Sequence, residues 1–166
     1  TGTMELGNPA SYQRIQIDDP FTLELGEESF SMIVDNKTLS RDGINRPQLI
    51  VSMISPTARF AFPRATPFEK TWDAAIQARD AAEEAVGEAI DWDLINWTIP
   101  AKRLSVFAAS PLNIVDTIAK SVGGIVETRA DGMLRVRHRF PVTVPDWQNT
   151  TVSHILTDAA DNLSSR

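Results

Sequence analysis

The clearest pattern of apolar and polar positions lies between residues 110 and 140. Over residues 110–122, apolar side chains recur every three or four positions, which indicates a helix with one buried face. Ser110 is a favoured N-cap, and Pro111 suits the first helical position because its missing N–H would have no partner there. The glycine pair at 123–124 can adopt the positive φ that closes a helix.

A β-hairpin is predicted directly after this helix. Residues 125–129 and 133–140 are rich in strand-forming side chains and flank Asp131-Gly132, a dipeptide typical of tight hairpin turns. Strict alternation in the second strand divides its side chains between two faces. One face holds Leu134, Val136, His138 and Phe140, and the other holds Arg135, Arg137 and Arg139. We expect the first face to form the core together with Leu112, Val115, Ala119 and Val122 of the helix.

The first half of the chain is predicted to consist of strands and loops. Short patterns indicate strands at residues 12–17, 21–25 and 29–34, the last two paired as a hairpin. Residues 35–47, which include Gly43, are predicted as a loop. The nearly continuous apolar run at 48–54 indicates a central strand covered on both faces. Prolines at 56, 63 and 67 then indicate an extended, non-helical segment between the two halves.

The remaining segment alternates between helix and strand patterns. Alanine-rich residues 71–87 predict a slim helix ending at Gly87, followed by strands at 90–99 and 104–108. The whole chain therefore reads as α+β, with two amphipathic helices packed on a mainly antiparallel β-sheet. We expect a β-rich N-terminal half at 1–66 and a helix–sheet half at 67–166 within one compact unit. Because the chain starts at Thr1 without Met and stops in polar residues, we also expect a fragment of a longer protein.

Composition removes several classes of function. The formal net charge of −6 opposes the basic surface expected of a nucleic-acid binder, so no specific nucleic-acid partner is predicted. The absence of cysteine excludes disulfides and cysteine-ligated metal centres. No apolar run approaches the roughly 20 residues that span a bilayer, so no membrane partner is predicted. The four tryptophans indicate an aromatic core or, alternatively, a subunit interface: Trp72, Trp92, Trp97 and Trp147.

Arg135, Arg137 and Arg139 form the most prominent charged row in this acidic chain. Together with Trp147, they are our candidate protein-contact surface. The simpler interpretation is a solvated face with local ion pairs, because exposed charges usually contribute little. Among functional interpretations, an acidic protein surface is favoured over nucleic acid, since no aromatic residues alternate with the arginines to stack on bases.

No catalytic residue, cofactor or metal site is predicted. His138 and His154 are the only histidines, and no phosphate-binding loop, nucleophile elbow or zinc-protease motif occurs. Asp91 and Asp93 share one side of a predicted strand, which is the minimum for a paired-carboxylate site. Such pairs more often form a polar sheet face, and Glu88 reads as a solubility charge, so we predict that the chain is not an enzyme.

The order of these units resembles the hub proteins at the tail tip or baseplate of tailed bacteriophages, related to the Mu-type baseplate hub and its prophage relatives. The resemblance covers roughly residues 20–147 and rests on these motifs: Ala61-Phe62-Pro63 before the predicted helix, Trp92 with Trp97-Thr98-Ile99-Pro100, Ser110-Pro111-Leu112 with Gly123-Gly124, and Asp131-Gly132-Met133-Leu134-Arg135-Val136. It implies a structural protein of the virion tail, assembled in the bacterial cytoplasm and without catalysis. The expected partners are tail-tube, spike or fibre proteins, with a homotrimer formed by the full-length protein.

Two other functions remain open at this level. One is a cell-wall hydrolase fragment that uses Asp91, Asp93 or Glu88. The other is a binding module of a phage-tail-like injection machine built on the same fold.

Overall fold

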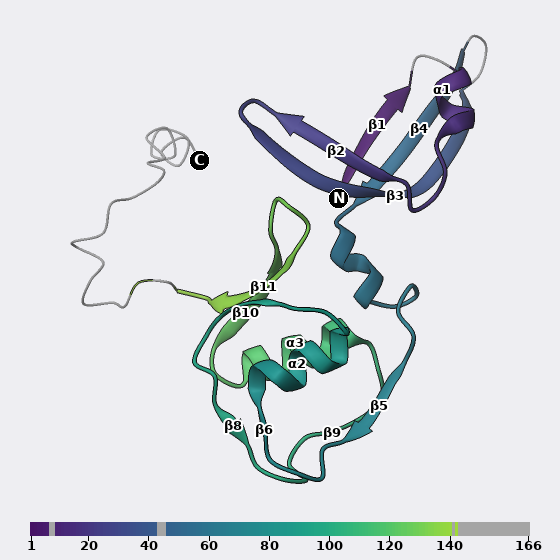
Figure 1. Ribbon diagram of the computed structural model, residues 1–166. Helices are drawn as coiled ribbons and strands as arrows, with labels where there is room; N and C mark the ends of the chain where they lie inside the picture. Colours follow the sequence, from purple (N-terminus) through teal and green to yellow (C-terminus); the bar gives the residue numbers. More distant parts are fainter. Residues whose placement is uncertain (7–8, 43–45, 141, 143–166) are drawn as a thin grey trace, which may run out of the picture.

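The computed structural model describes residues 1–6, 9–42, 46–140 and 142, and over these residues the fold is α+β, as predicted (Figure 1). The strands are β1 (Gly2–Leu6), β2 (Pro20–Leu25), β3 (Glu28–Asp42), β4 (Arg46–Ile54), β5 (Phe68–Thr71), β6 (Ile76–Gln77), β7 (Asp91–Asp93), β8 (Thr98–Ile99), β9 (Ser105–Ala109), β10 (Gly124–Thr128) and β11 (Leu134–His138). The helices are α1 (Pro9–Arg14), α2 (Ala78–Val86) and α3 (Pro111–Lys120), with a 3-10 helix, η1 (Pro56–Phe60). Within the described part of the chain, no helix has the length and apolar character needed to cross a membrane.

The N-terminal half is built on an antiparallel sheet with strand order β1-β4-β3-β2. The central position of β4 and the β2–β3 hairpin are confirmed. Burial of β4 nevertheless alternates, because Leu49, Val51 and Met53 are buried while the residues between them are half-exposed. The expectation that this strand is covered on both faces was therefore wrong, and its second face remains partly open.

Two other expectations for this half were wrong. Residues 12–14 belong to a helix, α1, and Tyr12 in the helix and Ile15 directly after it pack against the sheet core at a spacing of three. Over so few residues, that spacing is hard to distinguish from strand alternation. Residues 35–42 and 46–47, predicted as loop, extend the β3–β4 ladder, because cross-strand pairing overrides weak local turn signals. Gly43 lies outside the described residues.

The segment that joins the halves contains a helical turn that was predicted to be extended. Pro56 starts η1 at the first helical position, where proline loses no hydrogen bond. Thr57 and Phe60 are buried in this turn. Proline therefore begins the helical turn here and does not prevent it.

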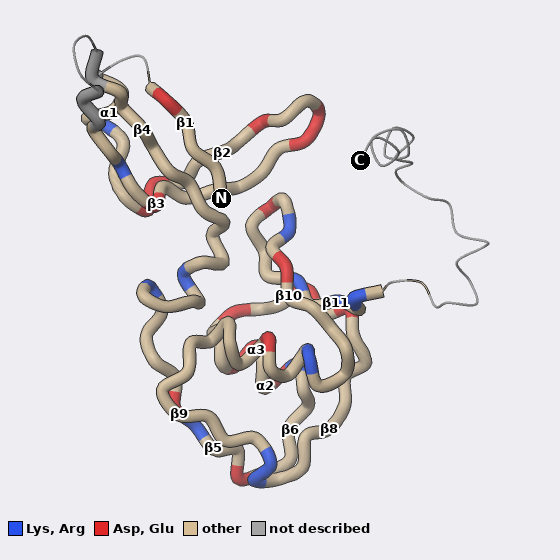
Figure 2. Tube along the Cα trace, turned by 180° about the vertical axis from the view of Figure 1, so that it is seen from behind, with Lys and Arg blue, Asp and Glu red and all other residues tan. Residues whose placement is uncertain are grey.

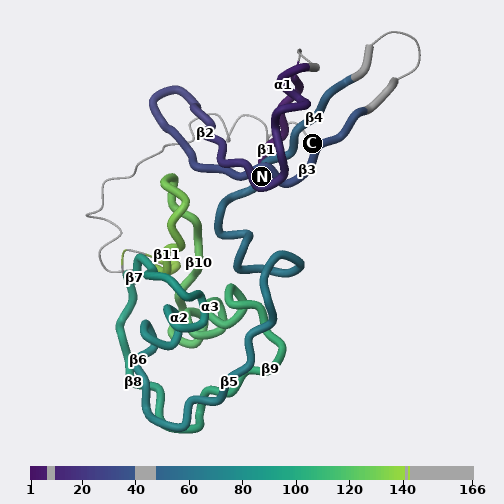
Figure 3. Tube along the Cα trace, turned by 45° about the vertical axis from the view of Figure 1, so that its right-hand side comes forward, coloured from purple at the N-terminus to yellow at the C-terminus, as the bar shows by residue number. Residues whose placement is uncertain are grey.

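In the second half, α2 and α3 lie side by side and are surrounded by short strands (Figures 1 and 3). The strands form three small groups, β10-β11-β7, β5-β9 and β6-β8. The buried core consists of one aromatic side chain and a set of small and branched ones: Trp72, Ala78, Ala81, Ala82, Ala85, Ile90, Ile114, Val115, Ile118, Ala119, Leu134 and Val136. Trp92 and Trp97 pack against this core and are only partly buried.

Helix α2 is shorter than predicted because its N-terminal part pairs with other segments. The backbone N–H of Trp72 donates to Leu104, and the carbonyl of Trp72 accepts from Lys102, which holds this region in extended structure. The helix begins only at Ala78, and the side chain of Asn96 accepts from the N–H of Arg79 in place of a local cap. Gly87 ends the helix in the left-handed conformation, as predicted. The strand predicted at 90–99 is two short strands, β7 and β8.

Helix α3 and the β10–β11 hairpin are confirmed. The Ser110 hydroxyl accepts from the N–H of Asn113, and Pro111 occupies the first turn. The predicted core is correct at Leu134 and Val136 but wrong at three positions, because Val122, His138 and Phe140 are exposed. All three lie beyond or at the end of their elements, where the opposing layer no longer covers the same face.

The two halves meet where the β10–β11 turn reaches the N-terminal sheet (Figure 3). The N–H of Ser31 donates to the carbonyl of Ala130 at 2.7 Å. Gly132 has φ +88°, and the turn has little room for a side chain at this position. A Cβ there would lie 3.0 Å from Pro56 Cγ and 3.3 Å from Ser31 Cβ. The hairpin turn is thus in direct contact with both the sheet and η1.

Candidate functional site

Arg135 and Arg137 of the predicted arginine row lie on β11, on the side opposite the buried Leu134 and Val136. Basic and acidic residues both occur along the chain around β10 and β11 (Figure 2). Arg135 Nη2 is 3.1 Å from Asp93 Oδ2, and Arg135 Nε is 3.5 Å from Asp91 Oδ2. These contacts follow from register, because β7 runs parallel to β11 and places Asp91 and Asp93 opposite Arg135 and Arg137. Arg135 is therefore engaged within its own chain.

Arg137 is engaged in the same way. Its Nε donates to Glu127 Oε1 at 2.7 Å across the hairpin. The hydrogen bond from Arg137 lowers the pKa of the Glu127 carboxyl below its ordinary value, although partial burial opposes the shift. The pKa of Arg137 is correspondingly raised, chiefly by its hydrogen bond to Glu127. Both groups are therefore ionised at neutral pH.

Arg139 stands apart from this network. Arg139 lies past the end of β11, with its guanidinium 5.7 Å from the centre of the Phe140 ring. Phe140 is 67% exposed, so this pair presents an apolar and a cationic group together. Trp147 and His154 lie outside the described residues.

The carboxylates considered for a hydrolase have arginine partners. Asp91 and Asp93 share one side of β7, as expected; Asp91 pairs with Arg129 at 3.0 Å, and Arg135 bridges both carboxylates. Glu88 instead pairs with Arg59 of η1 at 2.6 Å. His138 is exposed. Among the described residues, no group of three or more His, Cys, Asp or Glu side chains is placed to hold a metal ion.

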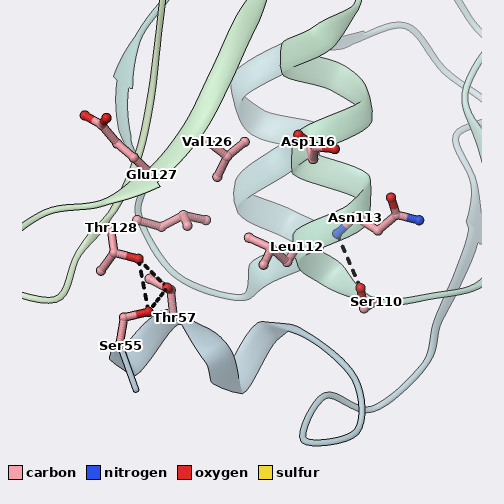
Figure 4. Close-up of a pocket in the computed structure, with 10 residues that line it drawn as sticks. Ser55, Thr57, Ser110, Leu112, Asn113, Asp116, Val126, Glu127 and Thr128 are labelled. Carbon is pink, nitrogen blue, oxygen red and sulfur yellow. Dashed lines mark hydrogen bonds between the residues drawn. The ribbon is translucent and has the colours of Figure 1, made fainter. Parts of the chain in front are cut away.

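The structure also contains a pocket that the sequence did not reveal. It opens between η1, the start of α3 and strand β10, and has a volume of about 450 Å³ (Figure 4). Its walls combine hydroxyl, carboxylate and aliphatic groups, contributed by Ser55, Thr57, Ser110, Leu112, Asn113, Asp116, Val126, Glu127, Thr128 and Leu134.

Three hydroxyl groups meet on one wall of this pocket. Thr57 Oγ1 lies 2.5 Å from Thr128 Oγ1 and 3.1 Å from Ser55 Oγ, and Thr128 Oγ1 donates to Ser55 Oγ at 3.4 Å. Thr57 is only 5% exposed. Each hydroxyl has one hydrogen and two lone pairs, so a closed ring of three uses every hydrogen and leaves acceptor positions.

The opposite wall is the first part of α3. Ser110 is occupied as the N-cap, while Asp116 Oδ2 pairs with Lys120 Nζ at 2.6 Å. This is an exposed i, i+4 pair, a type that stabilises a helix by only about 0.3–0.5 kcal/mol. The residues around the pocket come from segments far apart in the sequence, and Thr57 and Thr128 are 71 positions apart. No local motif could have identified this site.

Known proteins resemble this chain in fold only. No known family model matches the sequence, and no curated protein matches it significantly. Solved structures do match, and two of them are tail proteins. A tail protein from Neisseria meningitidis MC58 aligns with 72% of this chain at 14% identity and a TM-score of 0.57. The prophage MuSo2 43 kDa tail protein from Shewanella oneidensis aligns with 82% at 16% identity and a TM-score of 0.56.

The chain shares its fold with these tail proteins. It spans only about two fifths of their length, 39% of the first and 42% of the second.

Proposed function

We propose that this chain is a structural part of a phage or prophage tail, where it binds other tail proteins and catalyses no reaction. The supporting observation is that two solved tail proteins share its fold over 72% and 82% of its length. Fold alone does not determine function, so the proposal requires a direct test of assembly. More specifically, we propose a hub or baseplate component in the virion tail, assembled in the bacterial cytoplasm, that connects the tail tube to the spike or fibre.

The decisive experiment uses the full-length protein that contains this chain. We expect light scattering to give the mass of a homotrimer, and calorimetry to detect binding to the tail-tube protein expressed from the same genome. A monomeric full-length protein that does not bind tail-tube protein would rule out the hub.

Within this function, we propose that the surface around the arginine row contacts a partner. Arg139 and Phe140 are its best anchors, because Phe140 is exposed and Arg135 and Arg137 already have partners in the chain. Replacing Arg139 with Glu should weaken binding of the tail partner by about tenfold without changing the melting temperature. Lys102→Glu is a matched control, an exposed cation in the turn before β9. If Arg139→Glu and Lys102→Glu weaken binding of the tail partner equally, Arg139 is not part of the contact surface.

A cell-wall hydrolase is the main rival, and the ion pairs of Asp91 and Asp93 argue against it. A catalytic carboxyl group must be free to contact the substrate, whereas Arg129 and Arg135 of the same chain already pair with these two carboxylates. Peptidoglycan clearing by the full-length protein, abolished by Asp91→Asn while the fold is retained, would replace the structural function with an enzymatic one.

A further inference from the structure

The pocket between η1, α3 and β10 is surrounded by groups that accept hydrogen bonds. The ring of Ser55, Thr57 and Thr128 uses its three hydroxyl hydrogens internally and keeps one lone pair on each oxygen, and Asp116 is acceptor-only when ionised. None of the ten lining residues is a lysine or arginine. A ligand that fits these walls must therefore supply hydrogen-bond donors.

An anion is a poor fit even though the pocket lies beside a helix N-terminus. Helix N-termini bind anions through free backbone N–H groups. In α3 the first residue is Pro111, which has no N–H, and the N–H of Asn113 already donates to Ser110. The amides that would bind a phosphate or carboxylate are thus mostly unavailable, and Asp116 would repel it.

The apolar part of the lining adds a second requirement. Leu112, Val126 and Leu134 give the pocket an aliphatic surface. Figure 4 shows Leu112 and Val126 between the hydroxyl ring and Asp116. Arginine and lysine combine an aliphatic stem with a charged head rich in donors, and such side chains commonly lay the stem on apolar surface. A volume of about 450 Å³ is ample for one such side chain.

We propose that this pocket receives an arginine or lysine side chain from a partner protein. The inference rests on the proposed function, which supplies the partner, and it names the chemistry of the contact. Asp116 is the principal acceptor, because its present partner Lys120 is 68% exposed and can rotate into solvent. Glu127 takes no part in this contact, because its carboxylate is directed away from the pocket and is held by Arg137 on the other side of β10.

This arrangement predicts opposite effects for two neighbouring substitutions. Asp116→Asn removes the acceptor charge and should weaken binding of the cation about three- to tenfold. Lys120→Ala removes the internal competitor and should strengthen binding by a similar factor. The exposed pair Glu88 and Arg59 lies outside this pocket and offers matched controls, so Glu88→Gln and Arg59→Ala should each change binding by less than about twofold.

The probe is N-acetyl-arginine amide, titrated into the full chain and followed by NMR at the backbone amides of Leu112, Asn113 and Thr128. We expect saturating shifts with a dissociation constant in the millimolar range, about −4 kcal/mol at 1 mM, as is usual for a single side chain. No saturating shift at these amides, or the same loss for Asp116→Asn and Glu88→Gln, overturns the inference. Tighter binding of free 1,4-diaminobutane than of the arginine amide also overturns it, because the ligand would then be a small amine.

The inference and the proposed function can fail separately. If the full-length protein binds the tail-tube protein but the chain ignores the arginine amide, the tail function is supported and this pocket contact is rejected. If the amide binds but no tail protein does, the proposed function is rejected together with the partner assigned here.

Discussion

Replacing Gly132 with Ala should weaken the contact between the two halves of the chain. Gly132 has φ +88° in the β10–β11 turn, and the added Cβ would lie 3.0 Å from Pro56 Cγ and 3.3 Å from Ser31 Cβ. Both neighbours belong to the N-terminal half and its η1 segment. The substitution therefore strains the turn itself and also crowds the surface where the halves meet.

The two effects can be separated with a matched glycine. Gly26, in the β2–β3 turn, also has positive φ, at +65°, but a Cβ there meets no atom within 4 Å. Gly26→Ala should therefore cost only the conformational term, about 1–2 kcal/mol in free energy of unfolding. Gly132→Ala should cost this term plus about 1–3 kcal/mol from overpacking against Pro56 and Ser31. The difference of about 1–3 kcal/mol measures the contact.

Urea denaturation of the wild type and both variants gives the required free energies. The double variant Gly132→Ala/Pro56→Ala removes the ring atom that the new Cβ would touch, so it should recover part of the crowding term in a double-mutant cycle. If Gly132→Ala and Gly26→Ala lower the free energy of unfolding by the same amount, within about 0.5 kcal/mol, the turn is not packed against the N-terminal half and this reasoning is refuted.

Three further outcomes are expected. Ser110→Ala should cost about 1 kcal/mol in urea denaturation by removing the cap on Asn113, and Ser110→Asp should restore most of it. Leu134→Ala, at a position 1% exposed, should cost about 2–5 kcal/mol, whereas Phe140→Ala on the same predicted face should change stability by less than about 0.5 kcal/mol. Glu127 has a lowered pKa in the folded state, mainly through Arg137, so its stabilising effect is full above the unfolded-state pKa and is lost as pH falls through the folded one. Glu127→Gln should therefore be less stable than wild type at pH 7, and the difference in free energy of unfolding should narrow below about pH 4.5. A difference that does not change with pH would contradict the pairing of Glu127 with Arg137.

Elements with local signals were predicted well. Ser110 and Pro111 act on the backbone within one turn, so the start of α3 depends on nothing outside it. The same holds for Asp131-Gly132, where Gly132 takes positive φ and the side chain of Asp131 accepts from the N–H of Met133. Capping and turn chemistry are short-range, and sequence alone therefore locates them.

Elements that depend on distant partners were predicted poorly. Trp72 is extended because its backbone bonds to residues 102 and 104, and α2 starts at Ala78 with a cap from Asn96. Residues 35–42 and 46–47 of the predicted loop are strand, through the pairing of β3 with β4. In each case the deciding contact joins different elements, and for Trp72 and Arg79 the partners are far away in sequence, so the pattern of apolar and polar residues within one element does not reveal it.

The candidate sites likewise have one part that the sequence predicted and one part that only the fold created. Alternation alone placed Arg135 and Arg137 together on one face of a strand, because side-chain direction follows from backbone geometry. Their ion pairs required the parallel register of β7, and the pocket required Thr57 and Thr128 to be brought together across 71 positions. The sequence by itself thus determined caps, turns and the faces of single elements. The tertiary structure decided which faces are covered, which charges are paired and where a pocket forms, because these depend on contacts that exist only once the chain has folded.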